Sequence, residues 1–295
     1  MGGILVIGSY NRDTVLRLER FPAPGETLTA LGMVAFHGGK GSNQAVAAAR
    51  AGGRVGIIAA LGDDAVGQGA RALWAAEGID AQAVQTTQAP TGAATILLDA
   101  AGESQIIIIP GANAELTLPP GFTPPDDIAV ALAQLETPQA ATTALFRSLP
   151  QARRILNVAP AAPITPELLS VTDMLVLNET EAAILAQREA EPAALALALA
   201  AETMREVIVT AGAAGAIWAR PDGVVIDAAP PRVAVTDSTA AGDAFLGAFA
   251  AFSAAGLVQE RILRQAVAAG ALACTKEGAV PSLPYRAAIL ARSGH

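Results

Sequence analysis

The segment VTDSTAAGDAFLGAF (Val235–Phe249) passes from a polar turn into a long apolar stretch that predicts a helix. Three residues with little or no side chain, Ala240, Ala241 and Gly242, come directly before a single carboxylate, Asp243. We expect their backbone N–H groups to lie in the first turn of the helix, where N–H groups have no intrahelical partners and the helix dipole is positive. The segment therefore predicts an anion-binding site, because a ligand can approach these groups without meeting a large side chain.

Asp243 is open to two interpretations. A carboxylate at this position can complement the helix dipole, an effect of about 0.3–1 kcal/mol at a surface. However, three candidate caps, Asp237, Ser238 and Thr239, stand just upstream, so another carboxylate is not needed for that purpose. In the second interpretation, Asp243 accepts a hydroxyl proton while the N–H groups hold a phosphoryl group in transfer, and we favour it mainly for the family resemblance given below.

The composition of the whole chain is that of a folded enzyme. Of its 295 residues, 52% are hydrophobic and 16% are charged, which supports a large core and argues against disorder. The net charge of −8 and the aromatic content of 4% disfavour a nucleic-acid partner. The single cysteine, Cys274, allows no intrachain disulfide. The N-terminal apolar run lacks a basic flank and is too short for a signal peptide or a membrane span, so we expect a cytoplasmic protein with no membrane partner.

Strand and helix patterns alternate along much of the chain. A helix is expected to begin near Ser42, which can cap it. After Ile128 the alternation is regular and predicts an α/β fold, with a central, mainly parallel sheet flanked by helices on both faces. Two irregular, strand-rich stretches, roughly 10–36 and 90–109, leave this pattern. We expect them to pair as a small β-sheet lid on a single domain that spans residues 1–295.

The common nucleotide-binding signatures do not fit this chain. In the run HGGKGSN, Lys40 is followed by Gly41 rather than by Ser or Thr, so the P-loop pattern fails. The first strand runs into SYNRD rather than into G-x-G-x-x-G, so a dinucleotide-binding fold is unsupported.

Polar residues after the first strand form a candidate sugar pocket. On an extended segment, Asn11 and Asp13 point to the same face, where an amide and a carboxylate can bind adjacent hydroxyl groups. The other candidates are two glycines that allow close approach to a sugar ring and two polar residues, Gly38, Gly39, Asn43 and Glu136. The alternatives are ordinary turn chemistry for Asn11 and Asp13 and a solvated strand end for Glu136.

Taken together, these motifs resemble the ribokinase-like (PfkB) family of carbohydrate kinases. The runs GGKGSNQAVAAAR and VTDSTAAGDAFLGAF resemble the two family signatures, and GAN, QLETP, NVAPA, LNETEA, TAGAAG and ACTKEGAVPSLP stand in the family's order. The resemblance covers nearly the whole chain. It implies a ribokinase-like fold and ATP-dependent phosphorylation of the primary hydroxyl of a sugar, D-ribose to D-ribose 5-phosphate, with Mg²⁺, an activating K⁺ and a homodimer formed through the lid. The alternatives are a family member that acts on deoxyribose, fructose or a nucleoside, and a non-catalytic sugar sensor on the same fold.

The resemblance also implies roles for the residues in the two signatures. Asp243 would be the base that activates the sugar hydroxyl, and the backbone of Ala240, Ala241 and Gly242 would stabilise charge on the γ-phosphoryl group. Phosphoryl transfer has a loose transition state, so positioning and charge stabilisation matter more than the strength of the base. Lys40 would lie near the path of sugar and phosphate, with a solvated loop lysine as the alternative. The implied sugar contacts are Lys40, Asp243 and the pocket residues named above.

Nucleotide and cation sites follow from the same resemblance. Glu181 would help to hold hydrated Mg²⁺, although Asn178 and Glu181 also form a capping-box pattern. The implied ATP contacts are Asn178, Thr210, Gly212, Gly215, Ala241 and Gly242. The implied monovalent-cation ligands, largely backbone carbonyls, are Asp237, Thr239, Ala273, Lys276, Gly278 and Ser282. For Asp237, a helix cap is the alternative. Val267 replaces the polar side chain that ribokinases usually place near the adenine, so the nucleotide preference stays open.

Overall fold

The computed structural model of the protein describes residues 2–294. Its main sheet contains the strands β1 (Gly3–Ile7), β4 (Val55–Ile58), β9 (Ile128–Ala133), β10 (Arg153–Asn157), β11 (Met174–Asn178), β12 (Glu206–Thr210), β13 (Ala216–Ala219) and β14 (Val225–Ala228). Their spatial order is β14-β13-β12-β11-β10-β9-β1-β4. Strands β4 to β12 in this order pair in parallel, and β13 and β14 continue the sheet antiparallel. The predicted mainly parallel sheet is confirmed.

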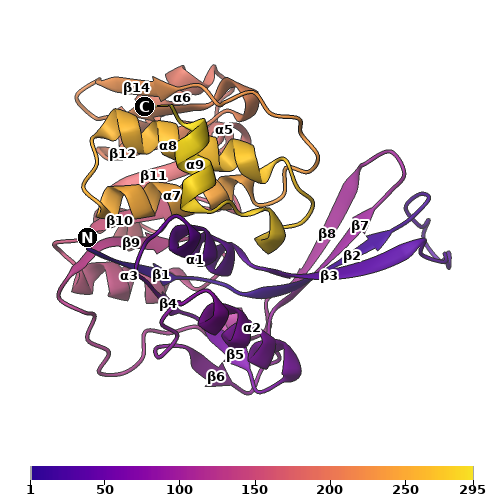
Figure 1. Ribbon diagram of the computed structural model, residues 1–295. Helices are drawn as coiled ribbons and strands as arrows, with labels where there is room; N and C mark the ends of the chain where they lie inside the picture. The colour runs from indigo at the N-terminus through magenta and orange to yellow at the C-terminus, as the bar shows by residue number, and fades with distance from the viewer. Residues whose placement is uncertain (1, 295) are drawn as a thin grey trace.

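Helices cover both faces of this sheet (Figure 1). One face carries α1 (Lys40–Arg50), α2 (Ala65–Ala76), α7 (Ala241–Ala254), α8 (Gln259–Ala273) and α9 (Arg286–Arg292). The other carries α3 (Gln139–Ser148), α4 (Pro166–Ser170), α5 (Glu179–Ala186) and α6 (Pro192–Thr203). Side chains alternate along each strand, so Ile4 and Val6 pack with the first group while Leu5 and Ile7 pack with the second. No helix within residues 2–294 is long and apolar enough to span a bilayer.

A second, four-stranded sheet projects away from the main body (Figure 1). Its strands are β2 (Asn11–Arg17), β3 (Gly32–Gly38), β7 (Ala93–Leu98) and β8 (Ser104–Ile109), in the order β3-β2-β7-β8. Its base lies close to the main sheet, because β2 begins four residues after the end of β1 and β3 ends two residues before α1. A further pair, β5 (Ala60–Gly62) and β6 (Gln85–Thr87), lies beside α2 in Figure 1.

The start of α1 differs from the sequence-based prediction. The helix begins at Lys40, directly after Gly39, whose φ of 85° brings the chain into the helix without a side-chain cap. The prediction that Ser42 caps this helix is therefore wrong. Ser42 is buried instead, and its Oγ accepts a hydrogen bond from Trp74 Nε1 at 3.0 Å.

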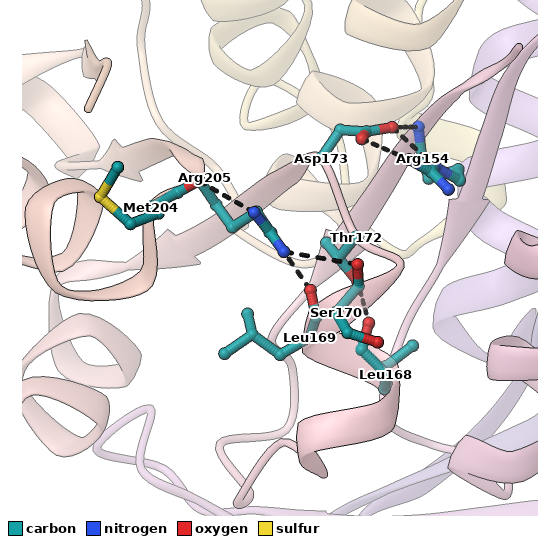
Figure 2. Close-up of polar contacts among 8 residues, drawn as sticks. All are labelled: Arg154, Leu168, Leu169, Ser170, Thr172, Asp173, Met204 and Arg205. Carbon is teal, nitrogen blue, oxygen red and sulfur yellow. Dashed lines mark hydrogen bonds and ion pairs between the residues drawn. The ribbon is translucent and has the colours of Figure 1, made fainter. Parts of the chain in front are cut away.

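Polar contacts fasten the amino ends of the central strands (Figure 2). Arg154, near the start of β10, donates to both carboxylate oxygens of Asp173, which precedes β11, at 2.8 and 2.6 Å. Arg205, which precedes β12, donates to the carbonyl oxygens of Leu169 and Ser170 at the end of α4, at 3.1 and 3.4 Å. Side chains at the amino ends of these strands therefore bond to one another and to the end of α4. The candidate site lies at the opposite, carboxyl ends of the strands.

Helices α1 and α7 approach each other closely at Gly247. A Cβ added there would lie 2.4 Å from the Cβ of Ala47 and 2.7 Å from the carbonyl oxygen of Gln44. Real Cβ contacts are essentially never that short, so a larger residue would push the two helices apart. The close approach fixes the distance between the first turns of α1 and α7.

We expect Gly247→Ala to lower the free energy of unfolding by about 1–2 kcal/mol. The added Cβ meets backbone atoms, so overpacking at the upper end of its range, about 2–3 kcal/mol, outweighs the better helix propensity of alanine, about 1 kcal/mol. Urea denaturation measures this change. Gly32→Ala in β3 is the matched control, because a Cβ there meets nothing within 4 Å. Unchanged stability of Gly247→Ala would contradict the close packing of the helices.

Candidate active site

A cavity of about 230 Å³ lies at the carboxyl ends of the parallel strands, the usual place for a ligand in an open α/β sheet. The ends of β10, β11 and β12 and the first turns of α1, α5 and α7 contribute to its wall. The structure brings the following predicted site residues together there: Lys40, Asn178, Glu181, Thr210, Ala240, Ala241, Gly242 and Asp243. These residues are up to 203 positions apart in the chain.

A second cavity of about 150 Å³ adjoins the first, because Thr210, Ala241 and Gly242 line both. Two further predicted nucleotide contacts, Gly212 and Gly215, also line it. Most of its remaining wall is apolar and consists of Pro230, Phe245, Val267, Gly270, Ala271 and Cys274. The predicted nucleotide residues therefore lie around two adjoining spaces, one polar and one mostly apolar.

Asp243 lies in the first turn of α7 and is buried. Its Oδ2 accepts a hydrogen bond from Asn43 Nδ2 at 3.0 Å, and its Oδ1 accepts one from Gln44 Nε2 at 2.9 Å. Burial raises the pKa of Asp243 above its ordinary value, against the opposing effects of Lys40 and the two amides. Asp243 is therefore not a surface carboxylate whose only role is to complement the helix dipole.

The residues before Asp243 form an uncapped helix start. Ala240 has a φ of 60°, in the left-handed region, and no side chain caps α7. The alternative role of Asp237 as a helix cap is therefore wrong. A Cβ at Gly242 would meet no atom of the described chain within 4 Å, so the glycine faces open space. The backbone at this turn is accessible to a ligand.

We expect Ala240→Gly to raise the free energy of unfolding by about 0.5–1 kcal/mol, since a non-glycine residue in the left-handed region costs about 1–2 kcal/mol. Ala241→Gly is the control, because Ala241 is helical, and there glycine should instead lower stability by up to about 1 kcal/mol. Thermal melting of both variants measures the difference. A loss of stability in Ala240→Gly equal to that in Ala241→Gly would argue against a left-handed Ala240.

Of the candidate sugar-binding residues, Lys40 and Asp243 line the first cavity, and the other six do not. Asn11 and Asp13 both belong to β2, so the alternative explanation by turn chemistry is wrong. Asn11 is buried, and its Oδ1 accepts a hydrogen bond from Asn113 Nδ2 at 2.9 Å. A Cβ at Gly38, opposite Asn11 in the β2–β3 pair, would lie 2.0 Å from Asp13 Oδ2. The carboxylate of Asp13 therefore lies directly against the backbone of Gly38.

Carboxylates surround the ammonium group of Lys40. Burial acts to lower the pKa of Lys40, but Asp243, Glu136, Glu181 and Asp13 together raise it above its ordinary value. Glu136 is part-buried, and its Oε2 accepts hydrogen bonds from the Lys40 backbone N–H at 2.9 Å and from Ser9 Oγ. The alternative interpretations of Lys40 as a solvated loop lysine and of Glu136 as a solvated strand end are therefore wrong.

Burial, together with Glu136 and Asp243, raises the pKa of Asp13 to about 7. The unfolded chain releases this proton near pH 3.8. Between these values the folded protein binds more protons than the unfolded one, so stability decreases as the pH rises. At pH 8 the folded protein holds an ionised Asp13 close to two other carboxylates.

We expect Asp13→Asn to remove this dependence. The free energy of unfolding of the variant minus that of the wild type should increase by on the order of 2–3 kcal/mol from pH 5 to pH 8. Urea denaturation at the two pH values measures it, with Asp227→Asn on the exposed part of β14 as the control. A difference that stays constant with pH would mean that Asp13 ionises near its ordinary value.

Asn178 and Glu181 form a capping box at the start of α5. Asn178 Oδ1 accepts from the Glu181 N–H at 2.8 Å, and Glu181 Oε2 accepts from the Asn178 N–H at 2.9 Å. Glu181 also lines the first cavity, and burial raises the pKa of its carboxyl. Within residues 2–294 no three His, Cys, Asp or Glu side chains are placed to hold a metal ion together. One carboxylate beside a phosphate-sized space fits Mg²⁺, which keeps most of its waters.

The predicted monovalent-cation ligands come from two segments that one side chain ties together. Asp237 accepts hydrogen bonds from Thr239 N and Oγ1 at 2.9 and 2.7 Å and from Gly278 N at 2.8 Å. Ala273 lies at the end of α8, where carbonyl groups carry partial negative charge. Lys276 can contribute only its carbonyl, since an ammonium group cannot bind a cation. A set made mainly of carbonyl and carboxylate oxygens fits a cation such as K⁺.

Sequence reasoning missed several residues that support the site. Gln44 and Gln134 belong to the hydrogen-bond network around Asp243, and Asn113 donates to Asn11. Gln44 lies one helical turn after Lys40 on α1, so the spacing of four residues could have identified it. Asn113 and Gln134 lie in the motifs GAN and QLETP, which carried the family resemblance but indicated no hydrogen-bond partner for either side chain.

The chain is similar to carbohydrate kinases over nearly its whole length. The sequence profile described as pfkB family carbohydrate kinase matches residues 1–286. The ribokinase of Haemophilus influenzae is 36% identical over 297 residues, which cover 96% of this chain and 95% of that protein. The ribokinase structure from Thermotoga maritima matches with a TM-score of 0.89 at 31% identity and covers 98% of both chains. The structure of Arabidopsis thaliana ribokinase complexed with ribose and ATP matches with a TM-score of 0.90 at 30% identity, again over 98% of both chains.

Proposed function

The chain belongs to the pfkB family of carbohydrate kinases, and we propose that it phosphorylates D-ribose with ATP to give D-ribose 5-phosphate. The observation that carries this proposal is a buried carboxylate, Asp243, in the same helix turn as the open backbone at Gly242. A proton acceptor and an anion site are then adjacent in one cavity. Phosphoryl transfer to a hydroxyl group requires both.

Asp243 would act on the hydroxyl group that receives the phosphoryl group. It takes the proton of the primary hydroxyl as that oxygen bonds to the γ-phosphorus. The bond between the γ-phosphorus and the bridging oxygen breaks, and ADP leaves. The backbone N–H groups of Ala240, Ala241 and Gly242 stabilise the charge on the transferred group. Bound Mg²⁺, held through Glu181, would neutralise charge on the phosphates.

The sugar would bind beside Asp243. Asn11 and Asp13 on β2 contact its hydroxyl groups, and Gly38 and Gly39 let the backbone approach the ring. Lys40, Asn43, Glu136 and Asp243 complete the pocket. The support is that Lys40 and Asp243 line the first cavity, and that Asn43 contacts Asp243 and Glu136 contacts the Lys40 backbone.

The nucleotide would occupy both cavities. Its phosphates lie near Asn178, Ala241 and Gly242, and its base enters the mostly apolar space beyond Thr210, Gly212 and Gly215. Val267 offers the base only an apolar contact. A bound K⁺ at the segments joined by Asp237 would hold the turn before α7 in place. Its ligands are Asp237, Thr239, Ala273, Lys276, Gly278 and Ser282.

The four-stranded sheet would act as a lid on a single domain. The two segments, roughly 10–36 and 90–109, supply its strands, and closure over the sugar would exclude water that competes for the phosphoryl group. Four consecutive isoleucines of β8, Ile106–Ile109, are 48–60% exposed. Pairing of two lids in a homodimer would cover this apolar edge strand.

An ADP-release assay tests the function, with ribose, deoxyribose, fructose, fructose 6-phosphate, adenosine and pseudouridine as acceptors, each with K⁺ and with Na⁺. We expect turnover on ribose that increases with K⁺. Preference for a nucleoside or a phosphosugar would retain the kinase chemistry and refute the proposed substrate. Ribose binding without turnover on any acceptor would favour a sugar sensor.

We expect Asp243→Asn to lower kcat by about 10²–10⁴, because the variant cannot accept the hydroxyl proton. The exposed Asp227→Asn serves as the matched control and should keep wild-type turnover. Ribose binding to both variants, measured by calorimetry, separates loss of chemistry from loss of fold. Unchanged turnover in Asp243→Asn would refute the role of Asp243 as the base.

A further inference from the structure

The side chain of Gln44 on α1 is completely buried, and its amide makes three hydrogen bonds. Its Nε2 donates to Asp243 Oδ1 at 2.9 Å and to Asn157 Oδ1 at 3.0 Å, and its Oε1 accepts from Gln134 Nε2 at 2.6 Å. Asp243 and Asn157 line the first cavity, whereas Gln44 does not. Gln44 therefore reaches the reaction only through its hydrogen-bond partners.

The partners of Gln44 fix the direction of its amide. Asn157 Nδ2 donates to the carbonyl of Val176 at 3.1 Å, so the oxygen of that amide is left to face Gln44. If the amide of Gln44 were turned over, its oxygen would face two other oxygens, on Asp243 and Asn157. Its nitrogen would then face the Nε2 group of Gln134. Only the donating orientation satisfies all the partners, so Gln44 presents an N–H to Asp243.

The groups around Asp243 determine whether its carboxyl is ionised, and the N–H of Gln44 is one of them. Burial favours the neutral acid, and hydrogen bonds donated to the carboxylate favour the ionised form. The charged groups that face Asp243 come from four elements, and only the first of them is positive: Lys40 on α1, Glu136 after β9, Glu181 on α5 and Asp13 on β2. Lys40 and the uncharged donors Gln44 and Asn43 therefore act together to favour the ionised carboxylate, against burial and Glu136.

We propose that Gln44 is a positioning residue for phosphoryl transfer, which fixes Oδ1 of Asp243 and keeps the carboxylate ionised so that its other oxygen accepts the hydroxyl proton. This inference rests on the proposed function, in which Asp243 is the base. Gln134 and Asn157 hold the amide of Gln44 in its donating orientation. The proton passes from the acceptor hydroxyl to Oδ2 of Asp243, and Gln44 keeps its own protons throughout.

Two substitutions separate the hydrogen bond from the shape of the side chain. Gln44→Met removes the donor, and Gln44→Glu keeps the shape and the oxygen that accepts from Gln134 but places a second carboxylate against Asp243. We expect the acidic limb of the pH profile of kcat/KM to move upward by about one to two pH units in Gln44→Met, the equivalent of one charge-assisted hydrogen bond, and further in Gln44→Glu. At a pH below the acidic limbs of both enzymes, kcat should fall by about 10–100-fold. KM for the sugar should stay within about threefold, because Gln44 does not line the cavity.

Gln265→Met is the matched control. Gln265 is a buried glutamine on α8 whose side chain makes no hydrogen bond to Asp243, so its replacement should leave the acidic limb unchanged. Gln134→Met is the second variant, because it leaves the donor of Gln44 in place and only frees its amide. We expect the acidic limb to move upward by less than in Gln44→Met. If Gln44→Met does not fold, this variant tests the proposal in its place, and an unmoved acidic limb would refute it.

A ¹³C NMR titration of the Asp243 carboxyl group measures its ionisation without turnover. A pKa that rises in the Gln44 variants supports the inference even if no sugar on the panel is phosphorylated, in which case the proposed function fails alone. The opposite result is also clear. If Asp243→Asn abolishes ribose phosphorylation but folded Gln44→Met keeps both the wild-type titration and the wild-type acidic limb, Asp243 remains the base and the role of Gln44 is refuted.

Discussion

The site depends on one constraint, the close contact between the first turns of α1 and α7. Neither helix has a side-chain cap at its start, and at the start of α7 the backbone of Gly242 faces open space. The contact at Gly247 brings α7 close enough for Asn43 and Gln44 to reach both oxygens of Asp243. A carboxylate from one helix is thus enclosed by donors from another, about 200 residues away in the chain. The parallel sheet holds both helices on the same face.

The energetics of the site follow from its crowding with acidic groups. Asp13, Glu136, Glu181 and Asp243 surround the ammonium of Lys40, and burial makes the repulsion among them stronger than it would be in water. Neutral groups donate hydrogen bonds to two of these carboxylates. The hydroxyl of Ser9 and the N–H of Lys40 donate to Glu136, and the side-chain amides of Asn43 and Gln44 donate to Asp243. Sugar hydroxyl groups are also neutral donors, so the same arrangement suits a neutral polyol better than an anionic sugar.

Regular patterns made most of the fold predictable from the sequence. The alternation after Ile128 predicted the parallel sheet, and the run of small residues before Asp243 predicted an accessible helix start. The error at Ser42 has a tertiary cause, since Gly39 turns the chain into the helix early and Trp74 occupies the Ser42 hydroxyl. The spacing of four residues from Lys40 could have identified Gln44, but its hydrogen-bond partners Gln134 and Asn157 lie on other elements. A buried amide network depends on three-dimensional neighbours, which leave no periodic trace in the chain.

The four-stranded sheet extends well beyond the site residues at its base, so a small rotation of the sheet there moves its far end further. Strand β2 begins at Asn11, beside the pocket, and continues to Arg17 at about 3.3 Å per residue. If the sheet rotates as a stiff body about its base at Asn11, a displacement at Asp13 becomes about three times as large at Arg17, which lies three times as far along the strand. A shift of about half an ångström at Asp13 would therefore become a movement of about 1.5 Å at Arg17. A spin label near Arg17 would detect a movement of the sheet that the site residues at its base transmit.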